Sequence, residues 1–318
     1  MRKEANEMLF PKELKIGDKV FLLCLSSAMN PDNVEKCVKK IEELGYIPIL
    51  GKSVKSNYGG YMAGSIETRL NDLHTAFSRE DVKAIICMRG GFSSGQLLDK
   101  INYDLIRKNP KIFVGYSDVT NLHIVLNQKC NLGTYHGPMV ESNMINDFND
   151  YTKNDFLKAI KMKKWKYEEP ENMPLKILKE GSENKIEGII TGGNLSLIVT
   201  TLGTKNEIDT KNKILFLEDI SEEIGRLDRM LTHLKLAGKL EDCNGIILGN
   251  FDDCSNRYEP SYTFEKMIKD FFRDYNKCVI YDFESGHKKP NMATIPLGAK
   301  CCIDIEKKEI MFEKEVIE

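Results

Sequence analysis

The sequence lacks several features that would place it in a specialised class of protein. No window approaches the roughly 18 apolar residues needed to cross a bilayer, and the first 20 residues have no apolar core of the kind found in secretory signals. The 46 basic residues nearly cancel the 48 acidic ones, so no net field attracts nucleic acid or an anionic membrane. We therefore expect a cytoplasmic protein that binds neither nucleic acid nor membranes.

Cysteine pairs with the spacing of metal or redox sites are also missing. The nine cysteines are an odd number and show no C-x-x-C spacing. Cys24, Cys87 and Cys130 lie in or beside apolar runs, where a reduced thiol behaves as a small hydrophobic side chain. We expect neither disulfide bonds nor a zinc site.

The length and the apolar pattern indicate two domains. With 318 residues, the chain exceeds the roughly 250 to 300 residues at which a single core stops growing. In the first half, apolar strands at 18–27, 83–91 and 111–116 alternate with helical patterns such as 31–45 and 94–101. Apolar strands separated by helices predict an α/β fold with a parallel sheet covered on both faces.

The pattern changes after about residue 160. A charged segment with two prolines and little periodicity follows, as is typical of an interdomain crossing, and short strands then dominate. We predict an N-terminal α/β domain at 1–160, an interdomain linker at 161–185 and a C-terminal β-rich domain at 186–318.

Ser117 stands at the corner between the strand KIFVG and the helical pattern that follows it. Ligands gather at the carboxyl ends of parallel strands, and VGYSDVT resembles a nucleophile elbow, although Val119 stands where that motif has glycine. Serine is also a preferred N-cap residue, and taken alone Ser117 fits a helix cap better than a nucleophile. A nucleophilic serine would need a base and an orienting carboxylate.

His287 and Glu218 are the candidates for base and carboxylate. The sequence has five histidines, and His287 is the one in a turn-rich loop, FESGHKKPN. His136 could line a site or make a structural hydrogen bond, and the other three fit structural or surface positions. Glu218 ends the apolar strand KILFLED, where a buried carboxylate needs a partner.

Several short motifs, in order and across nearly the whole chain, resemble the LD-carboxypeptidase family of serine peptidases. That family includes murein tetrapeptide carboxypeptidases and microcin C immunity peptidases. The motifs are Arg89-Gly90-Gly91, GYSDVTNLH at 115–123, HGP at 136–138, GGNLSL at 192–197, FLED at 216–219 and GH at 286–287.

The resemblance implies roles for particular residues. It makes Ser117 the nucleophile, His287 the base and Glu218 the carboxylate that orients it. The backbone N–H groups of Asp118 and Gly91 would form the oxyanion hole, although Gly90 is adjacent and the sequence does not distinguish the two glycines. The resemblance also implies a Rossmann-like N-terminal domain, a smaller β-rich C-terminal domain, no metal or cofactor, and a homodimer.

Two further residues keep alternative roles. Arg89 could anchor a substrate carboxylate or pair with a nearby acid, and Asn194 could contact substrate or cap the helix that follows it. The turn RGGFSSG has no lysine in the Walker A position and does not match G-x-G-x-x-G, which disfavours a nucleotide-phosphate site.

The resemblance favours a serine carboxypeptidase that removes the terminal D-alanine from an L,D-linked murein tetrapeptide in cell-wall recycling. The alternative within the family is a peptidase that cleaves amides of peptidyl or aminoacyl nucleotides, with the single tryptophan, Trp165, as a surface for stacking adenine. A non-catalytic α/β protein that binds a small ligand is the alternative from another class.

Overall fold

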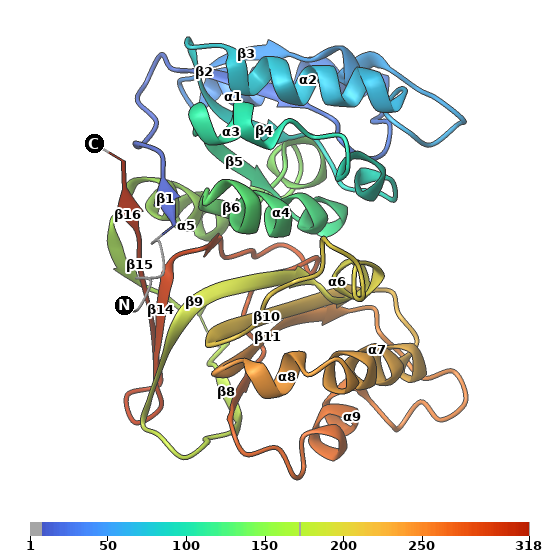
Figure 1. The fold of residues 1–318 in the computed structure, drawn as a ribbon, viewed down its shortest axis with the longest axis vertical. Coiled ribbons are helices and arrows are strands. Elements are labelled where there is room, and N and C mark those ends of the chain that lie inside the picture. The colour runs from blue at the N-terminus through green and yellow to red at the C-terminus, as the bar shows by residue number, and fades with distance from the viewer. Residues whose placement is uncertain (1–7, 172, 318) are drawn as a thin grey trace. The chain divides into compact units, whose positions relative to one another are not determined.

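The computed structural model describes residues 8–171 and 173–317 (Figure 1). The chain divides into two compact units, each with its own large sheet. The first unit contains residues 8–163, Ala293–Gly298 and 314–317, and the second contains the described residues of Lys164–Met292 and Ala299–Glu313. The chain therefore passes between the units at four places, and the first unit is assembled from three segments.

A six-stranded sheet forms the centre of the first unit. Its interior strands are buried almost throughout, as predicted for strands covered on both faces. Five strands run parallel and the edge strand β13 runs antiparallel to β6. In spatial order the strands are β13 (Ile295–Leu297), β6 (Thr134–His136), β5 (Ile112–Gly115), β4 (Val82–Cys87), β2 (Lys19–Leu23) and β3 (Ile47–Leu50).

The helices of the first unit are α1 (Val34–Glu43), α2 (Ile66–Ser78), α3 (Tyr103–Lys108), α4 (Thr120–Cys130) and α5 (Asp150–Lys161). The helix predicted at 31–45 forms, with a 3₁₀ turn before it. The helix predicted at 94–101 is wrong, since Ser94–Leu97 makes a 3₁₀ turn. There, the backbone N–H and the hydroxyl of Ser94 are both bound to Asp118, and these bonds replace a regular helical start.

An eight-stranded sheet forms the centre of the second unit. Its four middle strands run parallel and its outer strands run antiparallel to their neighbours. In spatial order they are β7 (Lys164–Lys166), β15 (Glu309–Glu313), β14 (Lys300–Asp304), β9 (Lys185–Asn194), β10 (Lys213–Ile220), β11 (Gly245–Asp252), β12 (Cys278–Tyr281) and β8 (Lys176–Lys179). The α/β fold class, with a parallel-rich N-terminal sheet and a separate β-rich C-terminal sheet, is confirmed.

Short helices accompany this second sheet: α6 (Leu195–Thr200), α7 (Ile224–Leu236), α8 (Lys239–Asp242) and α9 (Phe264–Phe271). The segment 161–185, expected to be a linker, instead carries the edge strands β7 and β8. These strands have three and four residues and are rich in lysine, which suits an exposed sheet edge and hides the apolar signal. None of the described helices is long and apolar enough to cross a membrane.

The last described segment belongs to the first unit. Strand β16 (Glu315–Val316) pairs in parallel with β1 (Leu9–Phe10). Before it, the buried Lys314 donates from Nζ to the Tyr135 hydroxyl at 2.9 Å and to the Ala159 carbonyl at 2.6 Å. Burial lowers the pKa of Lys314 to about 7. Residues near opposite ends of the described chain thus build one unit.

Candidate active site

Ser117 lies on a strained corner at the carboxyl end of β5. Its φ angle is 61°, in the left-handed region that non-glycine residues seldom adopt. The residue begins a 3₁₀ turn, Ser117–Val119, after which α4 starts at Thr120. Backbone strain of this kind gathers at functional sites, where the surrounding packing holds it in place.

The alternative in which Ser117 caps a helix is wrong. The N-cap positions of the 3₁₀ turn and of α4 are occupied by Tyr116 and Val119, and neither makes a side-chain capping bond. Ser117 lies inside the turn instead. Capping therefore does not explain the serine, while a half-buried serine on a tight strand-to-helix turn fits a nucleophile.

The RGG turn after β4 packs directly against Ser117. A Cβ added to Gly90 would lie 2.9 Å from the Ser117 Cβ and 3.0 Å from its Oγ, so this position needs glycine. The Gly90 carbonyl accepts a hydrogen bond from the Ser27 N–H at 3.3 Å. Because a trans peptide points its N–H away from its carbonyl, the Gly91 N–H faces away from Ser27.

His287 and Glu218 form a hydrogen-bonded pair in the second unit. Nδ1 of His287 lies 2.7 Å from Oε2 of Glu218, whose side chain is fully buried. Glu218 sits near the carboxyl end of β10, and His287 is in the loop that follows β12. These two strands flank β11 in the parallel part of the sheet, so both side chains come from its carboxyl edge.

The environment of this pair raises the pKa of His287 above its ordinary value. Burial by itself acts to lower that pKa, but the charge of Glu218 and its hydrogen bond favour the protonated ring and prevail, with help from Asp219 and Asp252. The glutamate thus stabilises the charged imidazole that would form when the ring accepts a proton.

Gly286 lets the loop approach Glu218 closely. Its φ angle is 137°, and an added Cβ would lie 3.1 Å from Oε2 of Glu218 and 3.3 Å from the Cβ of Asn250. The loop is held to β11 by the Asn250 N–H, which donates to the Ser285 carbonyl at 2.9 Å. Sequence reasoning missed Asn250, which has no motif of its own beyond its place at the end of an apolar strand.

The Arg89 side chain contacts other residues of the first unit. Its Nη1 donates to the Ala28 carbonyl at 3.2 Å and lies 3.9 Å from Oε2 of Glu141. The Arg89 side chain is 41% exposed. Pairing with an acid, one of its two predicted roles, is therefore present, and the exposed part of the side chain leaves the other role open.

Asn194 caps a helix. Its side-chain oxygen accepts from the Leu197 N–H at 3.2 Å, and its amide donates to Asp219 at 3.1 Å. The residue is 2% exposed, so the structure favours the capping alternative over direct substrate contact.

We expect Asn194→Ala to lower the free energy of unfolding of the second unit by about 1 kcal/mol, because it removes the cap of α6. Urea denaturation followed by circular dichroism measures this loss. Asn194→Ser keeps an uncharged N-cap acceptor and places no second carboxylate against Asp219, so it is the matched control. Equal stability of the alanine variant and the original protein would contradict the capping role.

The remaining histidines fall into structural or surface positions. His123 is fully buried, with Nδ1 2.9 Å from the Thr134 hydroxyl and Nε2 2.8 Å from the Gly115 carbonyl; burial lowers its pKa to about 4. His74 accepts from the Asn102 N–H, and His233 is exposed. His136 is buried in β6, with its ring 5.6 Å from that of Tyr116.

The cysteines, the possible metal ligands and Trp165 are also the subject of predictions from the sequence. All nine cysteines are free thiols. Within residues 8–171 and 173–317, no group of three or more His, Cys, Asp or Glu side chains is arranged to hold a metal ion. Trp165 is 4% exposed and packs on Phe312, so it is a core residue of the second unit and does not offer a stacking surface.

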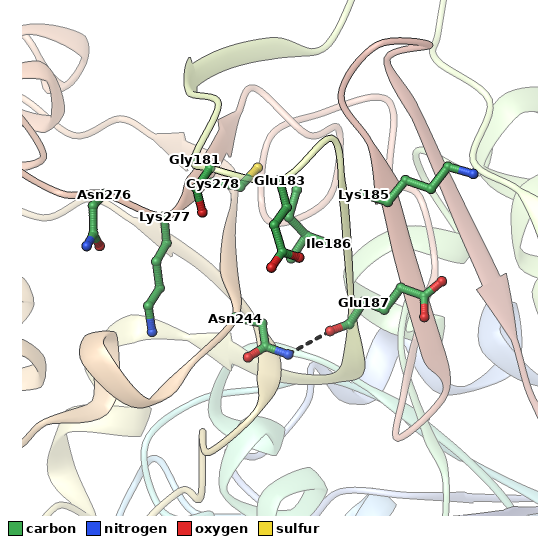
Figure 2. A pocket seen from close by; sticks show the side chains of 10 residues that line it. Gly181, Glu183, Lys185, Ile186, Glu187, Asn244, Asn276, Lys277 and Cys278 are labelled. Carbon is green, nitrogen blue, oxygen red and sulfur yellow. Dashed lines mark hydrogen bonds between the residues drawn. The ribbon is translucent and has the colours of Figure 1, made fainter.

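A pocket of about 420 Å³ lies elsewhere in the second unit (Figure 2). It is lined by the starts of β9 and β12 and by Asn244, whose amide donates to the Glu187 carbonyl at 2.7 Å. Along β9, Glu187 is seven residues before Asn194, the residue paired with Glu218, a separation of roughly 23 Å at 3.3 Å per residue. This pocket is therefore distinct from the Glu218–His287 pair.

Comparisons with known proteins show which family this chain resembles over its length. The family model described as LD-carboxypeptidase N-terminal domain matches residues 20–137, and that of the LD-carboxypeptidase C-terminal domain matches 187–303. A probable murein peptide carboxypeptidase of Bacillus subtilis is 40% identical, over 97% of this chain and 95% of that protein. The murein tetrapeptide carboxypeptidase of Pseudomonas aeruginosa is 28% identical over 87% and 91%.

A solved structure is also similar. That of the microcin C7 self-immunity protein MccF in complex with glutamyl sulfamoyl guanosine has a TM-score of 0.88 and 25% identity, covering 98% of this chain and all of that one. Together the matches define a hydrolase, a carboxypeptidase of the serine type. Both domain models are present in order along one chain. The protein belongs to the LD-carboxypeptidase family.

Proposed function

We propose that the protein removes the terminal D-alanine from an L,D-linked murein tetrapeptide, by way of an acyl-enzyme on Ser117. The observation that carries the proposal is the buried Glu218 held 2.7 Å from Nδ1 of His287, because this pair has the form of a base with its orienting carboxylate. The strained corner at Ser117 and the 40% identical murein peptide carboxypeptidase support it.

Each residue then has a defined step. Glu218 accepts from Nδ1–H, which leaves Nε2 as the ring nitrogen that takes the proton of Ser117. The Ser117 oxygen attacks the peptide carbonyl, and the Asp118 and Gly91 N–H groups stabilise the oxyanion. His287 next protonates the leaving amine of D-alanine, and water hydrolyses the acyl-enzyme by the same steps in reverse. The triad Ser117–His287–Glu218 is part of this proposal.

Product analysis tests the substrate. The protein would be incubated with murein tetrapeptide and, separately, with an aminoacyl sulfamoyl adenylate, and the products measured by mass spectrometry. Release of D-alanine from the first, with the second left intact, is the expected result, and it should be unchanged by EDTA. Cleavage of the adenylate alone would favour the function suggested by the similarity to MccF. No turnover of either would favour a ligand-binding protein.

The pH dependence tests the base. A base must be unprotonated to accept a proton, so kcat/KM should fall as pH drops through the pKa of His287. Because that pKa is raised, the midpoint of the fall should lie above the ordinary histidine value of about 6.5. Initial rates between about pH 5 and 9 measure it. A rate that is flat through this range, or a midpoint below 6.5, would contradict the assignment of His287.

The homodimer implied by the family resemblance stays a prediction. Light scattering coupled to size-exclusion chromatography would measure the mass of the assembly against that of the 36.3 kDa chain.

A further inference from the structure

The carboxyl group of Asp118 is buried beside the predicted nucleophile. The residue is 1% exposed, and its Oδ2 accepts hydrogen bonds from the Ser94 N–H at 2.8 Å and from the Ser26 hydroxyl. The Ser94 hydroxyl in turn donates to the backbone carbonyl of Asp118 at 2.6 Å. One side chain therefore ties the turn after β5 to the loops that follow β2 and β4.

These loops carry the groups expected to form the oxyanion hole. Gly90 and Gly91 lie in the loop after β4, three to four residues before Ser94. An added Cβ on Gly91 would lie 2.0 Å from the Ser27 Oγ, so this glycine is packed against the residue next to Ser26. The bonds of Asp118 thus fix the loop of one oxyanion-hole amide relative to the turn that supplies the other.

A buried arginine holds the same two loops. Arg69 is fully buried, and its Nη1 donates to the Leu25 carbonyl at 3.1 Å and to the carbonyl and hydroxyl of Ser93, each at 2.9 Å. Burial acts to lower the pKa of Arg69, and the negative charge of Asp118 opposes this effect. The arginine charge thus offsets part of the cost of burying the Asp118 carboxylate.

We propose that the side chain of Asp118 is a positioning residue, which sets the spacing between the Asp118 and Gly91 N–H groups and the orientation of Ser117. This inference rests on the proposed serine peptidase function. The role assigned by resemblance to Asp118 uses its backbone N–H alone, whereas this one uses its carboxylate. Oxyanion-hole donors must be held within about 0.5 Å of their productive positions, so three loops need such a common anchor.

Asp118→Ala and Asp118→Asn test the proposal through two rates. The first is turnover of murein tetrapeptide, and the second is labelling of Ser117 by a fluorophosphonate, whose tetrahedral adduct also needs the oxyanion hole. For Asp118→Ala we expect kcat and the labelling rate to fall about 100-fold, with KM changed less than about twofold. Asp118→Asn keeps an acceptor oxygen at the same place, so its kcat and labelling rate should be at least about tenfold higher than those of Asp118→Ala.

Asp72 provides a matched control in the same unit. Its carboxylate is also buried, and it accepts from the N–H groups of Lys52 at 3.0 Å and Ser53 at 2.6 Å, away from Ser117. Asp72→Ala should lower the thermal unfolding midpoint, as Asp118→Ala does, but leave both rates of the folded protein within about twofold. If Asp118→Ala does not fold, Ser26→Ala removes one donor to the carboxylate and should slow both rates roughly tenfold.

The outcomes separate this inference from the proposed function. An original protein that neither turns over peptide nor is labelled would overturn the proposed function and this inference with it. Two results would overturn the positioning role while leaving the nucleophile in place. One is a labelling rate in folded Asp118→Ala that equals the rate in the original protein. The other is an equal decrease of both rates in Asp118→Ala and Asp72→Ala.

Discussion

Ser117→Ala should lower kcat for D-alanine release by about 10⁴-fold or more, because it removes the oxygen that we propose attacks the peptide carbonyl. Substrate binding does not depend on that oxygen, so the Kd of the peptide should change little. Rapid-quench or long-incubation assays of released D-alanine measure the residual rate, and calorimetry measures binding. The thermal unfolding midpoint should not decrease, since an alanine leaves a left-handed corner no more strained than serine does.

Double substitution gives the sharper result. Members of a catalytic triad act as a unit, so Ser117→Ala combined with His287→Ala should lose little more than Ser117→Ala alone. His74→Ala, which alters a histidine in the first unit outside the proposed triad, is the control and should keep nearly full activity. Losses that multiply in the double variant would mean that the two side chains work independently, and the triad would have to be abandoned.

Glu218→Gln should lower kcat by about 10⁴-fold at neutral pH, because a neutral amide no longer fixes the His287 tautomer or stabilises the imidazolium. Glutamine has nearly the size of glutamate, so the buried site at the end of β10 stays filled. The remaining activity should also respond differently to pH. Without the glutamate charge, burial dominates and lowers the pKa of His287. The acid limb of the profile of kcat/KM against pH should therefore have its midpoint at a lower pH than in the original protein.

The direction of the His287 pKa shift also predicts how the free energy of unfolding depends on pH. The raised pKa of His287 means that the folded state favours the protonated ring; this contribution is fully present below about pH 6.5 and is lost as pH rises through the folded value. Glu218→Gln should remove that pH dependence. Glu284→Gln, which alters a buried carboxyl three residues before His287, is the matched control and should leave the acid limb in place. If Glu218→Gln leaves the midpoint of the acid limb unchanged, the Glu218–His287 pair is not what titrates in the pH profile.

The sequence predicts the parts of this molecule that local patterns determine. Apolar runs bounded by glycine gave the parallel strands of the first unit, because buried strands need nothing but apolar side chains and a turn. The motifs around Ser117, Glu218 and His287 identified the family and hence the candidate triad. The structure adds that Glu218 and His287 meet, 69 residues apart along the chain.

Other features depend on contacts that no local pattern records. The predicted helix at 94–101 has a helical composition, yet bonds from Ser94 to Asp118 prevent it from starting regularly. Strands β7 and β8 are short, lysine-rich and close to prolines, so their sequence resembles a linker, and pairing with β15 and β12 makes them strands. The sequence also could not predict the left-handed backbone of Ser117, because packing imposes this strain against the local preference of serine.

The assignment of β13 and β16 to the first unit has a consequence for biosynthesis. A ribosome delivers the chain from its N-terminus at about 5 to 20 residues per second, and domains generally fold as they emerge. The six-stranded sheet, whose strand β5 precedes Ser117, lacks its edge strand until Ile295–Leu297 has been made, after residues 164–292 of the second unit. The separate pair of β1 with β16 forms only after Glu315–Val316 has been made. The unit that begins to be translated first is therefore completed only after most of the second unit has been made, so a nascent chain that ends before Ile295 should lack part of the sheet next to the proposed nucleophile.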